Sequence, residues 1–133
     1  MDKNAYIEFQ NAFRQKCGLA GIQNYFLDGP LTENYWTTSP RIAVLNLEAY
    51  GYGNCGETIV DINLMKEWMQ ATGGKIKTKT SRYTSVFITG LQNSFSKDVA
   101  VSFQELREIY HNFDTLLDAM SKISYLNVRK HQT

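Results

Sequence analysis

The feature that most constrains the fold of this chain is a short apolar run, Arg41–Leu47, that follows Pro40. A run of this length, rich in branched residues and without apolar–polar alternation, predicts a β-strand that is buried on both faces. A second strand is predicted at Ile123–Val128. Because helical segments separate the two runs, the strands should pair in parallel. The sequence therefore predicts an α/β fold, a parallel sheet with flanking helices, in a single domain over residues 1–133.

Capping residues mark where the flanking helices should begin. Asp2 is placed to cap a first helix, and Asp61 to cap a second one with an apolar stripe. Ser102 and Glu105 form a capping-box pattern that opens a further helix. Asp114 is expected to start another turn or short helix.

Two segments have weaker patterns. Residues 21–40 contain turn signals and scattered aromatic residues, and are predicted to be irregular. Residues 75–82 alternate basic residues with Thr and Ile, which predicts a strand-like or loose segment, whereas residues 83–91 fit helical spacing.

Composition bounds the class of protein. Hydrophobic residues make up 43% and charged residues 20% of the chain, which is typical of ordered globular domains. The net charge of +1 argues neither for nor against binding of nucleic acid. Cys17, Cys55, His111 and His131 give neither a disulfide framework nor a metal-ligand spacing, so no metal or cofactor is predicted. The sequence contains neither a membrane-length apolar run nor a signal-peptide pattern, which predicts a cytoplasmic protein.

Candidate site residues gather where the predicted strands end. Open parallel sheets bind ligands beyond the carboxyl ends of their strands, which places the loop Glu48–Gly56 and Asn127 on one rim. Glu48 is a candidate to orient or deprotonate a water molecule. Tyr50 and Tyr52 would offer flat faces to a base, while the glycines between and after them let the backbone approach. Asn127 offers a donor and an acceptor to the edge of a pyrimidine.

Each of these residues also has a plainer interpretation. Glu48 would then be a solvent-facing loop carboxylate, and the two tyrosines would pack the loop onto the domain. Asn127 would satisfy neighbouring backbone groups at the end of its strand. A local basic stretch is suited to phosphate oxygens of DNA, although such a run is more often a solvated face; it consists of Lys75, Lys77, Lys79 and Arg82.

Together the two strand-end segments resemble the uracil-DNA glycosylase superfamily. The stretch Ile42–Gly51 resembles its first motif, in which an apolar strand ends in a loop with a water-activating residue. Glu48 falls at that water-activating position, and Tyr50 at the aromatic residue that screens the pyrimidine C5 edge. Ile123–Val128 resembles the later strand whose terminal asparagine reads the pyrimidine, which assigns that role to Asn127.

The resemblance implies a three-layer α/β/α fold, a flipped-out base as ligand, and hydrolysis of an N-glycosidic bond in DNA. The sequence departs from the family at Ala49, where a proline is usual, and lacks a match to the histidine-bearing second catalytic loop. Two explanations fit that departure: a fragment of a longer protein, or a short relative without catalysis.

Two non-enzymatic alternatives stay open. The same rim would serve a binding module that holds a base, nucleotide or protein partner without chemistry. A structural or regulatory protein would instead use exposed aromatics such as Tyr35 and Trp36 as interface anchors. The edges of a small sheet need covering, which also predicts self-association into a homo-oligomer.

Overall fold

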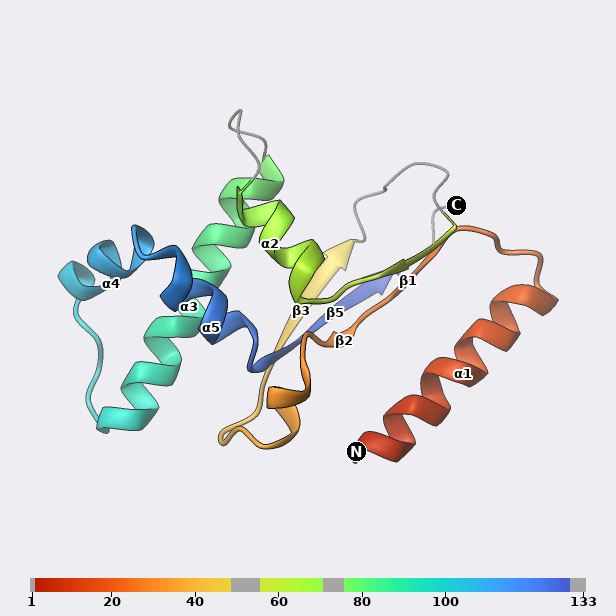
Figure 1. Ribbon diagram of the computed structural model, residues 1–133, viewed down its shortest axis with the longest axis horizontal. Coiled ribbons are helices and arrows are strands. Elements are labelled where there is room, and N and C mark those ends of the chain that lie inside the picture. Colours follow the sequence, from red (N-terminus) through yellow and green to blue (C-terminus); the bar gives the residue numbers. More distant parts are fainter. Residues whose placement is uncertain (1, 49–55, 71–75, 130–133) are drawn as a thin grey trace.

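The computed structural model describes residues 2–48, 56–70 and 76–129, with the side chains of 47–48, 76–78 and 128–129 outside the description. Five α-helices, one 3-10 helix and five strands make up these ranges (Figure 1). In chain order they are α1 Lys3–Leu19, β1 Tyr25–Leu27, β2 Gly29–Pro30, η1 Glu33–Trp36, β3 Ile42–Glu48, β4 Glu57–Ile59, α2 Ile62–Gln70, α3 Ile76–Lys97, α4 Phe103–Tyr110, α5 Phe113–Met120 and β5 Ile123–Arg129.

The main sheet has three strands in the order β2-β5-β3. β3 and β5 run in parallel, with Asn46 opposite Asn127. β2 pairs antiparallel with the other side of β5, where Gly29 lies opposite Tyr125. β1 and β4 form a separate parallel pair. The two predicted strands, their parallel pairing and the α/β class are therefore confirmed.

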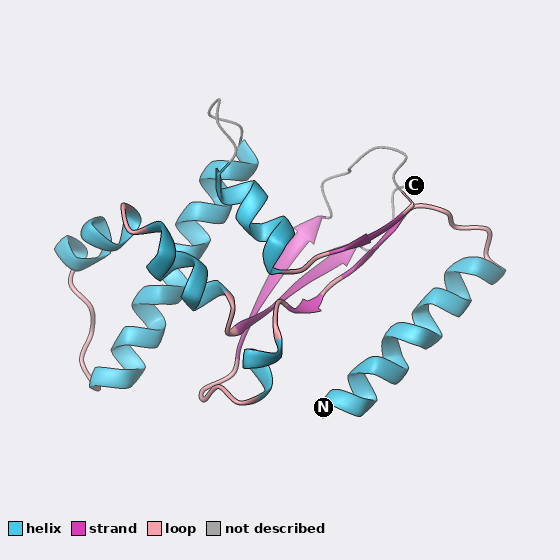
Figure 2. Cartoon of the chain, viewed as in Figure 1, coloured by secondary structure: helices cyan, strands magenta, loops and turns pink. Residues whose placement is uncertain are grey.

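The helices divide into two unequal groups around the sheet. Helices α2 to α5 gather on one side of it, and α1 stands alone on the other side (Figure 2). The core lies between the larger group and the sheet; its most completely buried side chains include Met65, Met69, Leu116, Met120 and Ile123. Among the described residues, no helix combines the length and apolar character that crossing a membrane requires.

The prediction that the first strand is buried on both faces is wrong. Ile42 and Val44 pack against the core, but Leu45 is 72% exposed and Ala43 is also exposed. Successive side chains of a strand point to opposite faces, and the helical group covers only one of them. β3 is therefore a strand with one open face, despite its continuous apolar sequence.

Three of the predicted helix starts are confirmed by their caps. The side chain of Asp2 accepts a hydrogen bond from the backbone N–H of Ala5 at 2.9 Å. Asp61 accepts one from Leu64 at the same distance. Ser102 forms the expected capping box at the start of α4.

The fourth helix begins one residue before the predicted start. Asn112, not Asp114, caps α5, and its side chain accepts a hydrogen bond from the backbone N–H of Thr115. Asp114 lies instead in the first turn of the helix, where a carboxylate favours the positive end of the helix dipole.

One segment prediction is wrong, and a second holds only in part. From residue 76, the segment predicted to be strand-like belongs to the long helix α3, whose small buried residues Ser81, Ser85 and Thr89 let it pack closely. Hydroxyls of this kind satisfy themselves along the helix, as Thr89 does by donating to the Ser85 carbonyl at 2.7 Å. Residues 21–40 hold β1, β2 and η1, elements of two to four residues that are too short to show periodicity.

Candidate functional site

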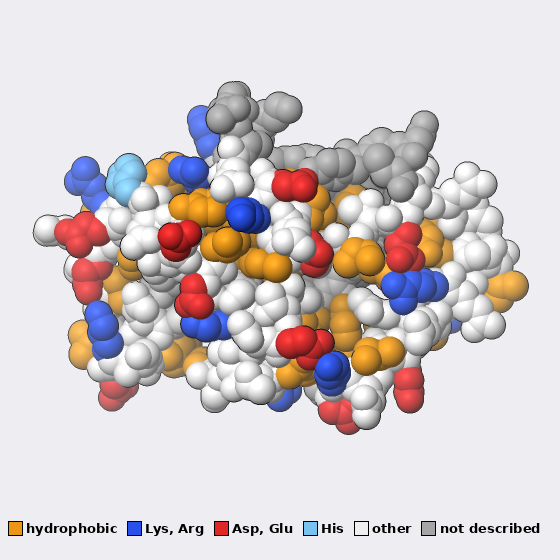
Figure 3. Space-filling view, viewed as in Figure 1, with side chains coloured by type: hydrophobic (Ala, Val, Ile, Leu, Met, Phe, Trp, Pro, Cys, Tyr) orange, Lys and Arg blue, Asp and Glu red, His pale blue; other side chains and the backbone are white. Residues whose placement is uncertain are grey.

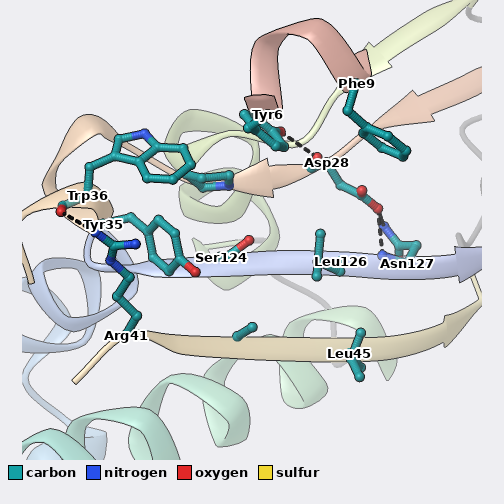
Figure 4. Close-up of a pocket in the computed structure, with 12 residues that line it drawn as sticks. Tyr6, Phe9, Asp28, Tyr35, Trp36, Arg41, Leu45, Ser124, Leu126 and Asn127 are labelled. Atoms are coloured by element: carbon teal, nitrogen blue, oxygen red, sulfur yellow. Dashed lines mark hydrogen bonds between the residues drawn. The ribbon is translucent and has the colours of Figure 1, made fainter. Parts of the chain in front are cut away.

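The open face of the main sheet forms the floor of a cavity of about 600 Å³. Ala43 and Leu45 of β3 and Ser124 and Leu126 of β5 provide an apolar floor with a single hydroxyl. The volume falls within the range of about 300–1,000 Å³ that is usual for small-molecule sites. The remaining lining comes from α1, the β1–β2 segment, η1, the residue before β3, and β5 (Figure 4); it consists of Tyr6, Phe9, Asp28, Pro30, Tyr35, Trp36, Arg41 and Asn127.

Aromatic rings and a guanidinium group form one end of the cavity. The Arg41 guanidinium lies 5.9 Å from the Tyr35 ring centroid and 5.7 Å from that of Trp36. Its Nη2 also donates to the Trp36 carbonyl oxygen at 3.0 Å. The rings of Tyr35 and Trp36 meet edge-on with centroids 5.2 Å apart. These contacts hold two aromatic rings and a positive charge side by side.

The sequence positions this aromatic end through η1. Thr32 caps the 3-10 helix by accepting a hydrogen bond from the backbone N–H of Asn34. The same hydroxyl donates to the Ser121 carbonyl at 2.6 Å, just before β5 begins. One threonine therefore fixes both the start of η1 and its position relative to the sheet.

A buried carboxylate and amide form the other end of the cavity. Asp28 and Asn127 are only 6% and 4% exposed. The Oδ2 atom of Asp28 accepts hydrogen bonds from the backbone N–H of Asn127 at 2.5 Å and from its Nδ2 at 2.9 Å. The Oδ1 atom of Asn127 accepts from Nδ2 of Asn46 at 3.4 Å. These bonds use one donor and one acceptor of the Asn127 amide, which has two of each.

Asp28 is held in place from the side of α1. The Tyr6 hydroxyl donates to the Asp28 carbonyl oxygen at 2.6 Å and accepts from Nε2 of Gln10. Burial, followed by the negative charge of Asp28, raises the pKa of Tyr6 from 10.0 to about 12. The next residue, Gly29, has φ of +151° and lies so close to the Tyr6 ring that a Cβ atom would collide with it.

The structure describes the predicted strand-end residues to different extents. Asn127 lines the cavity. Glu48 is the last residue of β3, and its Cα is paired with that of Arg129, so its backbone lies at the same edge of the sheet as the end of β5. Its side chain is outside the description. Tyr50 and Tyr52 belong to residues 49–55, which also lie outside the described part of the chain.

The basic stretch does not join the cavity where it is described. Lys79 is an exposed residue of α3, on the helical side of the sheet. Arg82 donates from Nε to the Met69 carbonyl at 2.9 Å and lies over the Tyr110 ring, which ties it to neighbouring helices. Lys75 and the side chain of Lys77 are outside the description. On the face shown in Figure 3, basic and acidic side chains are interspersed, without a large patch of either sign.

The sequence did not single out Asp28 or Arg41, and the role it suggested for Tyr35 and Trp36 was a different one. Asp28 was available as a signal, because it is an acid placed directly after the apolar triplet Tyr25–Leu27. Arg41 was counted only as the start of the strand. Tyr35 and Trp36 were singled out as interface anchors, whereas the structure brings them to the same cavity as Asn127.

Two further observations bear on the chemistry of the cavity: the search for a metal site and the comparison with known proteins. Among the described residues, no cluster of three or more His, Cys, Asp or Glu side chains is arranged to hold a metal ion. Comparisons with protein-family models, with curated proteins and with solved structures found no match to this chain.

Proposed function

We propose that the protein recognises a nucleobase in the cavity on the open face of β3 and β5, in the manner of a uracil-DNA glycosylase. The observation that carries the proposal is that the two ends of the cavity differ in chemistry and are joined by one apolar floor. A ring surface with a guanidinium, Tyr35, Trp36 and Arg41, lies at one end, and the buried amide of Asn127 at the other.

This arrangement suits a planar ligand with a hydrogen-bonding edge. Aliphatic side chains such as Leu45 and Leu126 contact the face of a heterocycle, and aromatic rings stack on it. The remaining N–H and lone pair of the Asn127 amide match the alternating acceptor and donor of a pyrimidine edge. Because Asp28 fixes one N–H of that amide, the orientation of its oxygen and nitrogen is set before a ligand arrives.

The catalytic part of the proposal assigns Glu48 to the water. Glu48 would accept a proton from a water molecule as that water attacks the sugar C1′ atom. The bond between C1′ and the base nitrogen breaks, and the base leaves with the bonding electron pair. The observation behind this role is that Glu48 ends β3 two residues after Asn46, whose Cα is paired with that of Asn127, so the Glu48 backbone lies at the same end of the sheet as Asn127.

A second candidate is binding of the same ligand without chemistry. The observation in its favour is that Asp28, the carboxylate in the described lining of the cavity, is bonded to Asn127. That carboxylate therefore serves to position the amide.

A base-release assay with a parallel binding measurement separates the two candidates. Single-stranded and duplex oligonucleotides containing one uracil are incubated with the wild type and with Glu48→Gln. The glycosylase proposal expects release by the wild type only, and binding of the oligonucleotide by both proteins. Binding without release by either protein supports the non-catalytic candidate. Absence of both binding and release contradicts both candidates.

Arg41→Met tests the cavity itself. Arg41 is exposed and lies outside the core, so its loss should leave the fold intact. We expect weaker binding of the uracil oligonucleotide, because the guanidinium no longer stacks against the rings or faces the ligand. Lys79→Met, a matched loss of charge on the other side of the sheet, is the control and should leave binding close to that of the wild type.

A further inference from the structure

Within the described residues, no strand pairs with the outer edge of β3. β3 is the last strand of the order β2-β5-β3, and β5 is the only described strand that pairs with it. Exposed strand edges usually carry prolines, lysines or bulges that prevent association. The residues from Ile42 to Leu45 carry none of these, and all four are apolar.

An apolar groove runs beside this edge. It has a volume of about 460 Å³ and lies between β3 and α3. Tyr83 and Phe87, one helical turn apart on α3, are each 63% exposed although they line it. The other residues of the groove are Ile42, Ala43, Val44, Thr84, Ile88 and Leu91. An edge strand beside a helix with an apolar groove between them is the geometry that accepts an added strand.

Charge indicates which kind of strand would bind. α3, which forms one wall of the groove, contains neither Asp nor Glu in its sequence, and its exposed Lys79 lies one helical turn before Tyr83. An added strand with acidic residues is therefore attracted to this wall. A second copy of the chain is a poorer occupant, because pairing β3 with itself would bring two basic α3 helices together.

We infer that the groove between β3 and α3 binds an extended segment of a protein partner by strand addition. The segment pairs through its backbone with the edge from Ile42 to Leu45 and extends the sheet by one strand. Its alternate side chains are apolar and contact Tyr83 and Phe87, and acidic residues flank them. This site shares only Ala43 with the lining of the proposed nucleobase cavity and does not depend on that cavity.

The test is selection from a phage-displayed library of random dodecapeptides on the full chain. Enriched peptides should alternate apolar residues and carry acidic ones. The variant Phe87→Ser should weaken their binding by about tenfold or more, as loss of an aromatic anchor usually does. Phe95→Ser is the matched control: it removes an equally exposed ring, 61% against 63%, from the same helix but outside the groove. Its effect should stay within about twofold.

Backbone pairing is tested with N-methylated versions of an enriched peptide. A strand uses alternate N–H groups toward one neighbour, so methylating one alternate set should abolish binding while methylating the other set should not. Absence of enrichment would overturn the inference, as would binding that Phe87→Ser leaves unchanged or that both methylated sets retain. A dimer in sedimentation that Phe87→Ser dissociates would also overturn it, in favour of a second copy as occupant.

Discussion

Replacing Asp28 by alanine should destabilise the protein by about 2–4 kcal/mol, because two buried donors lose their acceptor. The backbone N–H and the Nδ2 of Asn127 both donate to Asp28 Oδ2, and Asn127 is 4% exposed. An unsatisfied buried donor costs about 1–3 kcal/mol. Removing the carboxylate also removes the cost of burying a charge, which offsets part of the loss. The sum of two donors less that offset gives the expected range.

Urea denaturation followed by circular dichroism measures the effect as a shift of the midpoint at constant slope. Asp28→Asn keeps one acceptor oxygen and should lose about half as much stability as Asp28→Ala. Asp114→Ala, at an exposed position in the first turn of α5, is the control and should cost less than about 1 kcal/mol. A loss below about 0.5 kcal/mol for Asp28→Ala would refute the assignment of Asp28 as the group that holds the end of β5.

Three further predictions concern the contacts around this site. Gly29→Ala should cost about 2 kcal/mol or more in a thermal melt, because its φ of +151° disfavours other residues and a Cβ would collide with Tyr6. The wild type should lose stability as pH rises from 10 to 12, since the pKa of Tyr6 is about 12 when folded and 10.0 when unfolded; Tyr6→Phe should remove that part of the slope in urea titrations. The hydrogen bond from Arg14 lowers the pKa of Glu57 below 4.5, so the pair stabilises the fold at neutral pH and this contribution is lost as pH falls below that value. In urea titrations at acid pH, Arg14→Met should lose less stability with falling pH than the wild type does. An equal loss in both proteins would contradict the role of the pair.

The sequence predicted those elements whose signal is local and repeated. Branched residues over six or seven positions were enough to find β3 and β5, and side-chain caps located α1, α2 and α4. Parallel pairing followed from the helical stretch between the two strands. These features depend on neighbours in the sequence, and the structure confirms them.

What the sequence did not predict depends on contacts between distant segments. The apolar run of β3 gives no sign that Ala43 and Leu45 are left uncovered, because that depends on where α1 lies. The threonines and β-branched residues of α3 favour a strand locally, whereas the close packing of Ser85 and its neighbours in the core stabilises the helix.

The cavity is similarly non-local. Asp28 and Asn127 are 99 positions apart, and their hydrogen bond forms only because β2 pairs with β5. Asn127 was identified because it ends an apolar strand, but its partner was not. Arg41 and Trp36 meet through η1, an element of four residues that has no periodic signal.

The most direct test of the proposed nucleobase cavity is an NMR titration of the wild-type protein with 2′-deoxyuridine. We expect the side-chain amide signal of Asn127 and the indole N–H signal of Trp36 to shift together along one saturable curve, while the indole signal of Trp68, which lies on helix α2, does not move. The same titration of Arg41→Met should require more ligand. Absence of shifts at millimolar ligand, or shifts confined to residues outside the cavity, would contradict the claim.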